Sequence, residues 1–256
     1  MNSRTKTFNL LWTGGWDSTF QLLRLVFCSQ VDIQPYYLID EDRRSTRFEL
    51  VTMRNIRAAI ARTDESAAKR IRPTILATVS EVPACLSITD AFNRIRGRRF
   101  IGSQYDWLAR FCKARDVRNL QLCIHRDDKA AKAIEHVIVR HDSDVPYVQP
   151  PVDKNMAYEH LVFGRFEFPV LDLTKRDMLE ASIEHGWLPV METTWFCHSP
   201  RAGKPCGRCN PCVYTAEEGL SWRVPMSRQI SGRVYNYTVK PVREFLRARV
   251  RQIAGL

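Results

Sequence analysis

The feature that most constrains the fold is a pair of adjacent glycines between an apolar run and a helical pattern. Residues 8–12 are apolar, Gly14 and Gly15 follow, and residues 21–27 carry apolar side chains at helical spacing. This order predicts a strand, a tight turn and the start of a helix. Glycines let the backbone turn sharply and approach a ligand closely, and the free amides of a helix start favour an anion. We therefore expect the turn to hold phosphate.

The turn matches neither of the two common nucleotide-binding patterns. No lysine follows as in G-x-x-x-x-G-K-[ST], and the glycines are adjacent where G-x-G-x-x-G has them spaced. A third kind of phosphate loop is therefore predicted. The segment reads Thr13-Gly14-Gly15-Trp16-Asp17-Ser18-Thr19.

Strand-like and helix-like segments alternate after this turn. Such alternation predicts an α/β fold with a doubly wound, mostly parallel sheet. The cysteines near the end of the chain add a small C-terminal zinc-binding region to this prediction. Ligands bind beyond the carboxyl ends of the strands in such sheets, which is where the glycine turn would lie. The predicted strands are residues 8–12, 34–39, 73–78 and 120–124, and the predicted helices are residues 18–29, 46–63, 88–96, 105–115 and 129–139.

The later part of the chain is less regular. The prolines of residues 142–155 predict a loop, and residues 166–170 predict another short strand. Thr174 is predicted to cap a helix that ends near Gly186, with Asp177 at its third position.

Four clustered cysteines predict a metal site with the spacing C-x8-C-x2-C-x2-C. Four thiolates close a tetrahedral site and leave no open position for water, which indicates structural Zn²⁺. An iron–sulfur cluster is the alternative, because such clusters also use C-x2-C-x2-C runs. The predicted ligands are Cys197, Cys206, Cys209 and Cys212.

Composition indicates a globular protein with a basic C-terminal tail. The chain has 256 residues and is 45% hydrophobic, which allows a sizeable core. No run reaches the ~18 apolar residues of a membrane helix, and residues 1–6 lack the apolar stretch of a secretory signal. We therefore expect a cytoplasmic protein with no membrane partner. Residues 223–256 hold eight basic residues against one acid, so a polyanion or acidic partner is expected there.

The tail is also predicted to form a basic amphipathic helix, with an apolar face and an arginine face. One interpretation is that it docks on its own domain or on a twin subunit. The other is that it recruits a nucleic acid or an acidic protein. The apolar face would hold Val242, Phe245, Leu246, Val250 and Ile253, and the basic face Arg243, Arg247 and Arg251.

Three motifs together resemble the PP-loop ATP pyrophosphatases, and among them the family of 7-cyano-7-deazaguanine synthases. The SGGxDS loop of that family is similar to residues 13–18, where Thr13 replaces the first serine. The T-K-x-[DE] helix start is similar to residues 174–177. The TWSCY stretch and the CG-x-C-x-x-C knuckle are similar to residues 194–198 and 206–212. The resemblance spans roughly residues 8–220.

The resemblance implies an ATP-dependent ligase that releases AMP and pyrophosphate. The carboxylate of 7-carboxy-7-deazaguanine would be captured as an acyl adenylate, and an amine would then attack to give an amide or a nitrile. Asp17 would orient the loop or bind Mg²⁺, and Lys175 would neutralise charge between the phosphates. The alternatives are a helix cap for Asp17 and a solvated position for Lys175. The residues expected to bind ATP are Thr13, Gly14, Gly15, Asp17, Ser18 and Thr19.

The middle of the chain departs from the family. Residues 99–105 hold no arginine–asparagine pair where the family has P-x-R-N. After the strand at residues 120–124, the segment with Arg126, Asp127 and Asp128 looks like the acidic strand end of the family and is the predicted substrate site. A carboxylate can accept two hydrogen bonds from the N–H edge of a guanine-like base. The alternative is that Asp127 caps the next helix.

We expect three regions: a PP-loop nucleotide-binding domain at residues 1–190, a zinc knuckle at residues 191–222 and the basic tail at residues 223–256. The first functional hypothesis is the deazaguanine ligase, with ammonia or an amine on a macromolecule as nucleophile. Some synthase relatives are associated with bacterial antiviral systems. The second is a tRNA-modifying PP-loop enzyme that adenylates a base, and the third is a non-catalytic nucleotide-binding module. A protein or tRNA acceptor would engage the tail, and the resemblance suggests a homodimer.

Overall fold

The computed structural model describes residues 7–140, 145–151, 156–242, 245–246 and 249. The chain divides into two compact units, of which the first comprises Met1–Asp42 and Thr46–Trp195 and the second Arg43–Ser45 and Phe196–Leu256. The glycine turn belongs to the first unit and the four cysteines to the second.

The first unit is built on a seven-stranded sheet with the order β3-β2-β1-β4-β7-β6-β5. The strands from β3 to β7 in this order are parallel, and β6 and β5 add an antiparallel edge. The predicted α/β class with a mostly parallel sheet is therefore confirmed. The strands are β1 (Thr7–Leu11), β2 (Asp32–Ile39), β3 (Ile75–Thr78), β4 (Leu120–Gln121), β5 (Ile138–Val139), β6 (Tyr147–Val148) and β7 (Phe166–Glu167).

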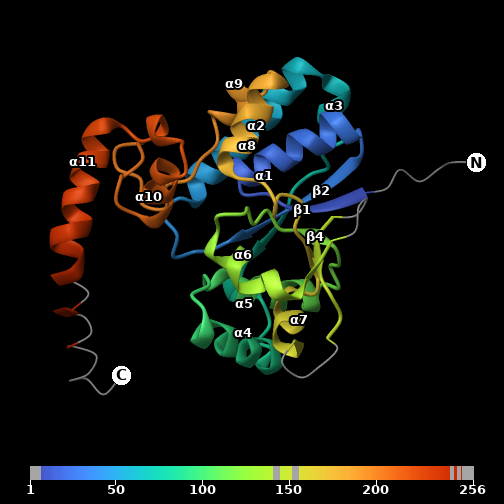
Figure 1. The fold of residues 1–256 in the computed structure, drawn as a ribbon. Coiled ribbons are helices and arrows are strands. Elements are labelled where there is room, and N and C mark those ends of the chain that lie inside the picture. The colour runs from blue at the N-terminus through green and yellow to red at the C-terminus, as the bar shows by residue number, and fades with distance from the viewer. Residues whose placement is uncertain (1–6, 141–144, 152–155, 243–244, 247–248, 250–256) are drawn as a thin grey trace, which may run out of the picture. The chain divides into compact units, whose positions relative to one another are not determined.

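Helices cover both faces of this sheet (Figure 1). On one face α1, α2, α8 and α9 contact one another, and on the other face α4, α5 and α7 do so. The arrangement is the predicted doubly wound one. The helices are α1 (Trp16–Leu23), which continues as the π-helical η1 (Arg24–Ser29), α2 (Thr46–Thr63), α3 (Glu65–Lys69), η2 (Val79–Glu81), α4 (Leu86–Arg98), α5 (Gln104–Ala114), α6 (Lys129–Ile134), η3 (Glu135–Val137), α7 (Ala157–Phe163), α8 (Lys175–Glu184) and α9 (Leu188–Met191).

The strand order reverses at the middle of the sheet. From β1 the chain moves outward to β2 and β3 and then returns to place β4 on the other side of β1. A ligand of an open α/β sheet binds at such a switch point, beyond the carboxyl ends of the strands. The loops that follow β1 and β4 therefore hold the residues to inspect first.

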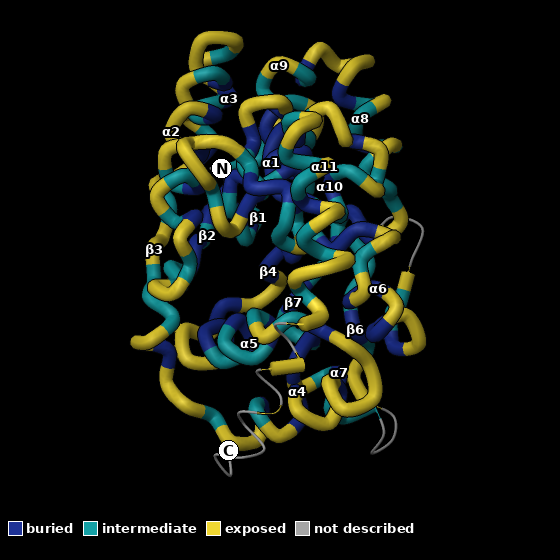
Figure 2. The backbone as a smooth tube through the Cα atoms, turned by 90° about the vertical axis from the view of Figure 1, so that its left-hand side faces the viewer, coloured by how far each residue is buried: buried dark blue, intermediate teal, exposed yellow. Residues whose placement is uncertain are grey.

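Apolar periodicity accounts for the core on both faces. Met53, Ile56 and Ile60 recur at helical spacing in α2 and are buried. On the other face a cluster of buried side chains includes Phe163 and Phe168, which have 0% exposure. Figure 2 shows the same pattern, with β4 buried at the centre, β1 mostly half-buried and exposed residues on the outer helices. Burial of these faces fixes the sheet on which the loops are mounted.

Two of the predicted elements are corrected by the structure. The helix expected at residues 129–139 ends earlier, because Ile138–Val139 forms β5. These β-branched residues suit a strand edge better than a helix. The expected loop at residues 142–155 contains β6, whose two residues pair with β5 and β7. Residues 142–144 and 152–155 lie outside the described part of that segment.

The second unit contains the cysteine segment and a C-terminal helix. Its elements are α10 (Asn210–Glu217), η4 (Ser221–Arg223), α11 (Met226–Val234) and the π-helical η5 (Tyr235–Val239). Helical residues follow η5 at positions 240–242, 245–246 and 249. Of the apolar face predicted for the tail, Val242, Phe245 and Leu246 are helical and exposed. The side chains of Val250, Ile253, Arg243, Arg247 and Arg251 lie outside the described residues. Within the described ranges, no helix has the length and apolar character needed to cross a membrane.

Candidate active site and metal centre

The glycine turn follows β1 and leads directly into α1. Gly14 has a φ of +69°, and a Cβ there would lie 3.2 Å from side-chain atoms of Met53 and Thr52. Both the left-handed backbone and the crowding therefore require glycine. The backbone N–H of Trp195 donates to the Gly14 carbonyl at 2.9 Å, so the segment before the cysteines holds the turn. The Trp195 ring in turn stacks on Phe48, with 4.7 Å between the ring centroids.

The hydroxyl groups of the loop have different partners. Ser18 Oγ accepts from the Thr13 N–H at 3.4 Å and lies 3.5 Å from the Gly15 carbonyl, so it ties the turn together. Thr19 is fully buried, and its Oγ1 accepts from Trp12 Nε1 at 3.1 Å. Its N–H donates to Gly15. Of the residues predicted to bind ATP, Thr19 is thus the one most engaged with the protein core.

Asp17 does not cap its helix. The N-cap of α1 is Gly15, and no side chain caps this end. Asp17 Oδ1 is buried and has no hydrogen-bond partner among the described residues. A buried carboxylate oxygen without a partner is costly, and a bound cation would satisfy it. The capping alternative is therefore wrong, and the carboxylate fits a Mg²⁺ ion that accompanies a nucleotide.

Titratable side chains from three separate parts of the first unit meet at the switch point. His125 follows β4, and its Nδ1 lies 3.8 Å from Oδ2 of Asp17. Burial raises the pKa of the Asp128 carboxyl, the charge of Asp17 raises it further, and His125 and Lys175 lower it. The predicted catalytic residues Asp17 and Lys175 therefore both lie within electrostatic range of Asp128. The site therefore combines residues that follow β1 and β4 with the first residue of α8.

His125 is the residue of this cluster that sequence reasoning missed. Its side chain is 5% exposed and contacts the carboxylate of Asp17. A lone histidine beside Arg126 gives no periodic signal in the sequence. The signal in the sequence is its position, because it directly follows the strand predicted at residues 120–124, at the end where ligands of such sheets bind.

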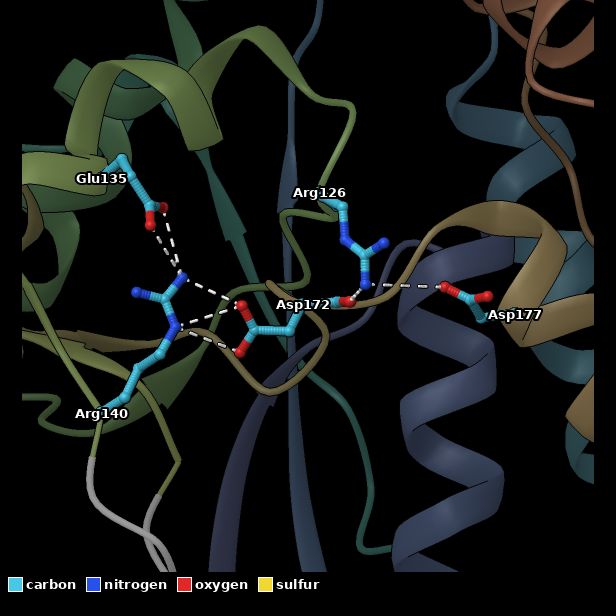
Figure 3. Close-up of polar contacts among 5 residues, drawn as sticks. All are labelled: Arg126, Glu135, Arg140, Asp172 and Asp177. Carbon is cyan, nitrogen blue, oxygen red and sulfur yellow. Dashed lines mark hydrogen bonds and ion pairs between the residues drawn. The ribbon is translucent and has the colours of Figure 1, made fainter.

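Arg126 and Asp172 connect the end of β4 to the start of α8. Figure 3 shows the Arg126 guanidinium between the Asp172 carbonyl, to which it donates, and the Asp177 carboxylate. Its Nη2 lies 4.0 Å from Oδ2 of Asp177. Asp172 also pairs with Arg140, whose Nη2 lies 2.9 Å from its carboxylate and 3.2 Å from that of Glu135. Arg126 therefore holds the segment that carries Lys175. The substrate-binding role of Arg126 stays a prediction.

The two neighbouring aspartates differ in environment. Asp127 is exposed. Asp128 is the N-cap of α6, because its carboxylate accepts from the Ala130 N–H at 2.8 Å. The alternative that Asp127 caps this helix is therefore wrong. Asp128 is the aspartate that faces the cluster of Asp17, His125 and Lys175.

The helix that carries Lys175 begins with the predicted cap. Thr174 Oγ1 accepts from the Asp177 N–H at 3.1 Å, and the Asp177 carboxylate accepts from the Thr174 N–H at 2.7 Å. These two hydrogen bonds form a capping box. They fix the residues on either side of Lys175, and they lower the pKa of Asp177.

The four predicted metal ligands converge in the second unit. The sulfur atoms of Cys197, Cys206, Cys209 and Cys212 all lie within 4.8 Å of one another. Backbone N–H groups donate to these sulfurs, among them Cys206 N–H to Cys197 Sγ at 3.2 Å. Such donors stabilise thiolates, and four soft ligands in one cluster suit Zn²⁺. The cluster predicted from spacing is therefore assembled by the fold.

The turn between the cysteines is packed against α11. Gly207 has a φ of +73°, and a Cβ there would collide with the backbone carbonyl of Arg228. A Cβ on Gly232 would collide in the same way with the Gly207 backbone. Two glycines thus allow the helix and the cysteine turn to approach closely.

Comparisons with known proteins find partial matches to the family that the motifs indicate. The family model described as "Queuosine biosynthesis protein QueC" matches residues 155–221, which include Lys175 and the four cysteines. The 7-cyano-7-deazaguanine synthase of Prochlorococcus marinus (strain MIT 9515) is 34% identical over 56 residues. That stretch covers 22% of this chain and 24% of the relative. The predicted resemblance to QueC-like PP-loop proteins is therefore confirmed.

Proposed function

We propose that this protein uses ATP to adenylate a carboxylate, that of 7-carboxy-7-deazaguanine, and passes the acyl group to an amine. The observation that carries the proposal is the convergence of Asp17, Lys175 and Asp128 beside the Gly14 turn at the switch point of the sheet. The match of residues 155–221 to the QueC model supports the substrate class.

The proposed reaction has two steps. A carboxylate oxygen of the acid attacks the α-phosphorus of ATP, and the bond to pyrophosphate breaks. The amine nitrogen then attacks the acyl carbon and loses a proton, and AMP leaves with the bonding electron pair. The backbone amides at the start of α1 would hold pyrophosphate, because a helix start favours an anion. Bound Mg²⁺ would neutralise phosphate charge, with Asp17 as the residue that holds it.

Lys175 and Asp128 have distinct roles in this proposal. Lys175 is a fixed cation at the start of α8, positioned by the capping box on either side of it. It would offset the negative charge that accumulates between the phosphates in the transition state. The Asp128 carboxylate would accept hydrogen bonds from the N–H edge of the deazaguanine. The sulfur cluster would bind Zn²⁺, which stabilises the second unit and supplies no reacting atom.

The test is pyrophosphate release with ATP, Mg²⁺ and 7-carboxy-7-deazaguanine. We expect release that depends on the acid and that Asp17→Asn abolishes. Asp90→Asn is the matched control, because Asp90 is an exposed residue of α4. Equal release without the acid, or none with it, would overturn the proposal. Measurable turnover that Asp17→Asn abolishes would also exclude a non-catalytic binding module.

The nucleophile is the second part of the proposal. Ammonia would give an amide. A nitrile would need a second ATP, whose α-phosphorus the amide oxygen attacks with loss of pyrophosphate, after which AMP leaves with that oxygen and the nitrogen loses its protons. An amine on a protein would instead give a conjugate, a role consistent with antiviral defence. The basic residues at positions 223–256 are the proposed contact for such an acceptor. Mass spectrometry of the products with ammonia, and with each candidate acceptor, distinguishes a free nitrile from a mass increase on the acceptor. We further propose that the protein acts in the cytoplasm as a homodimer.

The basic tail also favours a second candidate, a PP-loop enzyme that adenylates a base in tRNA. Eight basic residues against one acid in residues 223–256 would contact phosphates. The protein should then bind tRNA with an affinity that falls steeply as the salt concentration is raised. Absence of tRNA binding would exclude this candidate.

A further inference from the structure

A cavity of about 200 Å³ lies among α4, α6, η3 and α7 of the first unit. It includes none of the residues assigned above to ATP, to the deazaguanine or to the metal. Figure 1 shows α4, α6 and α7 gathered in one layer. The cavity is lined by Ile95, Arg98, Arg99, Ala133, His136 and Glu159.

The cavity is acidic at its floor and basic at its mouth. Glu159 is 3% exposed, and it lies with the buried apolar residues Ile95 and Ala133. Arg98 and Arg99 are exposed, and the side chain of His136 is 53% exposed. A ligand that enters would therefore meet two guanidinium groups first and a carboxylate last.

The buried Glu159 carboxylate is only partly compensated, with His136 as its ion-pair partner among the described residues. Its Oε2 is buried and accepts no hydrogen bond from the described residues. Its Oε1 lies 3.7 Å from His136 Nε2, which is longer than a hydrogen bond. Burial of a carboxylate oxygen without a hydrogen bond costs free energy, and N–H donors from a ligand would recover that cost. The floor of the cavity is thus chemically suited to an ammonium group.

The two arginines are held at the mouth and keep donors to spare. Arg99 Nη1 donates to the Lys132 carbonyl at 2.6 Å. The Arg98 guanidinium lies over the ring of Tyr158, 5.9 Å from its centroid. A guanidinium has five N–H donors, and these contacts use few of them. The remaining donors can bind a carboxylate in the paired geometry that arginine favours.

We infer that this cavity binds a small zwitterion of the amino-acid class, with its ammonium group at Glu159 and its carboxylate at Arg98 and Arg99. The cavity is smaller than the roughly 300–1,000 Å³ of pockets that hold drug-sized ligands. A ligand with only one charge satisfies one end and leaves the other unpaired.

The test is a titration of the full-length protein, without ATP, with a series of ω-amino acids. Glycine, β-alanine, 4-aminobutyrate and 5-aminovalerate differ in the separation of their two charges. Butyrate and butylamine carry one charge each and serve as controls. Binding is measured by calorimetry and by shifts of backbone amide resonances in α4 and α7. We expect one chain length to bind best, at least tenfold more tightly than either single-charge control.

Three variants assign the binding to this cavity. Glu159→Gln keeps the shape of the side chain and should weaken binding at least tenfold. Arg98→Gln should do the same, and because Arg98 is exposed this variant tests the site without disturbing the core. Arg96→Gln is the matched control on the same helix and should bind like the wild type, since Arg96 does not line the cavity.

Three results would each overturn the inference. Binding of no amino acid up to ~10 mM would overturn the inference, and so would butylamine binding as tightly as the best amino acid. Unchanged affinity in folded Arg98→Gln would overturn it as well. None of these results depends on pyrophosphate release, so the inference and the proposed function fail independently.

Discussion

His125 places Nδ1 3.8 Å from Oδ2 of Asp17, where the loops after β1 and β4 meet. The histidine is almost fully buried, so its ring restricts the positions that the carboxylate can adopt. It is therefore a positioning residue for Asp17, and its removal tests whether the orientation of that carboxylate matters.

We expect His125→Ala to lower kcat for pyrophosphate release by about 10–100-fold, as is typical when a residue that orients a functional group is removed. His125→Gln, which retains polar atoms at this position, should recover part of the loss. The KM for ATP should change less than kcat, because the backbone amides of α1 remain. His185→Ala, at an exposed position, is the control. A purely structural role predicts instead that both variants lose folded protein while the remaining fraction keeps its kcat.

Gly14→Ala should damage the loop. The substitution combines a φ of +69° with a Cβ 3.2 Å from its neighbours, which should cost about 1–2 kcal/mol of folding free energy. It should also abolish pyrophosphate release by moving the turn. Gly97→Ala in α4 is the matched control, because nothing lies within 4 Å of a Cβ there. That change should leave the activity intact and raise stability by about 0.5–1 kcal/mol, as urea denaturation can measure.

The capping box should make stability depend on pH. Hydrogen bonds from Thr174 hold the pKa of Asp177 below the ordinary aspartate value of 3.8. A carboxyl whose pKa is lowered by folding stabilises the protein above its unfolded pKa, and this contribution is lost as the pH falls through the folded pKa. The difference in unfolding free energy between wild type and Asp177→Asn should therefore be largest near pH 7 and shrink below about pH 3.8. A difference that grows toward low pH would contradict the assignment.

The same helix start allows the cap to be separated from catalysis. Thr174→Ala should cost ~1 kcal/mol, the usual loss when a threonine N-cap is removed. Lys175→Gln leaves both hydrogen bonds of the capping box in place, so it should reduce pyrophosphate release with little change in stability. If Lys175 is merely a solvated lysine of the first turn, Lys175→Gln will turn over like the wild type.

The four cysteines should bind one zinc ion per chain. We expect elemental analysis to give one equivalent of zinc and a colourless protein, whereas an iron–sulfur cluster would absorb visible light. Cys209→Ser should lose the metal and lower the thermal stability of the second unit, because structural zinc contributes folding free energy directly. Cys28→Ser is the control, since Cys28 is exposed and outside the cluster. Full zinc content in Cys209→Ser would show that the metal binds elsewhere.

Long periodic segments were predictable from the sequence, whereas several of the short ones were not. The helix predicted at residues 46–63 is α2 with the same bounds, because its apolar residues recur over several turns. β5 and β6 have two residues each, which is too short for any period, and the prolines around β6 concealed it. Similarly, α7 and α9 were not predicted, because helices of seven and four residues give little periodic signal.

The candidate site was predictable where motifs encode it locally. The glycine turn, the cap at Thr174 and the four cysteines depend on residues close in sequence, and the structure shows the turn, the cap and the sulfur cluster. The contact of His125 with Asp17 joins residues more than a hundred positions apart, so only the order of the strands creates it. The hydrogen bond from Trp12 Nε1 to Thr19 Oγ1 also depends on the folded turn, because it joins residues on either side of the two glycines.

The π-helical turn η5 determines which residues the C-terminal helix presents together. A π turn holds about one residue more than an α turn, so it absorbs one position between Val234 and Val242. Met226, Ile230 and Val234 therefore stay in phase with Val242 and Phe245, and all five are exposed. If η5 straightened into a regular α-helix, everything beyond it would rotate by about 100°. The alignment of these apolar side chains therefore depends on the extra residue in η5. If the turn became α-helical, deleting one residue there would keep the side chains aligned, whereas a regular helix with all its residues would not.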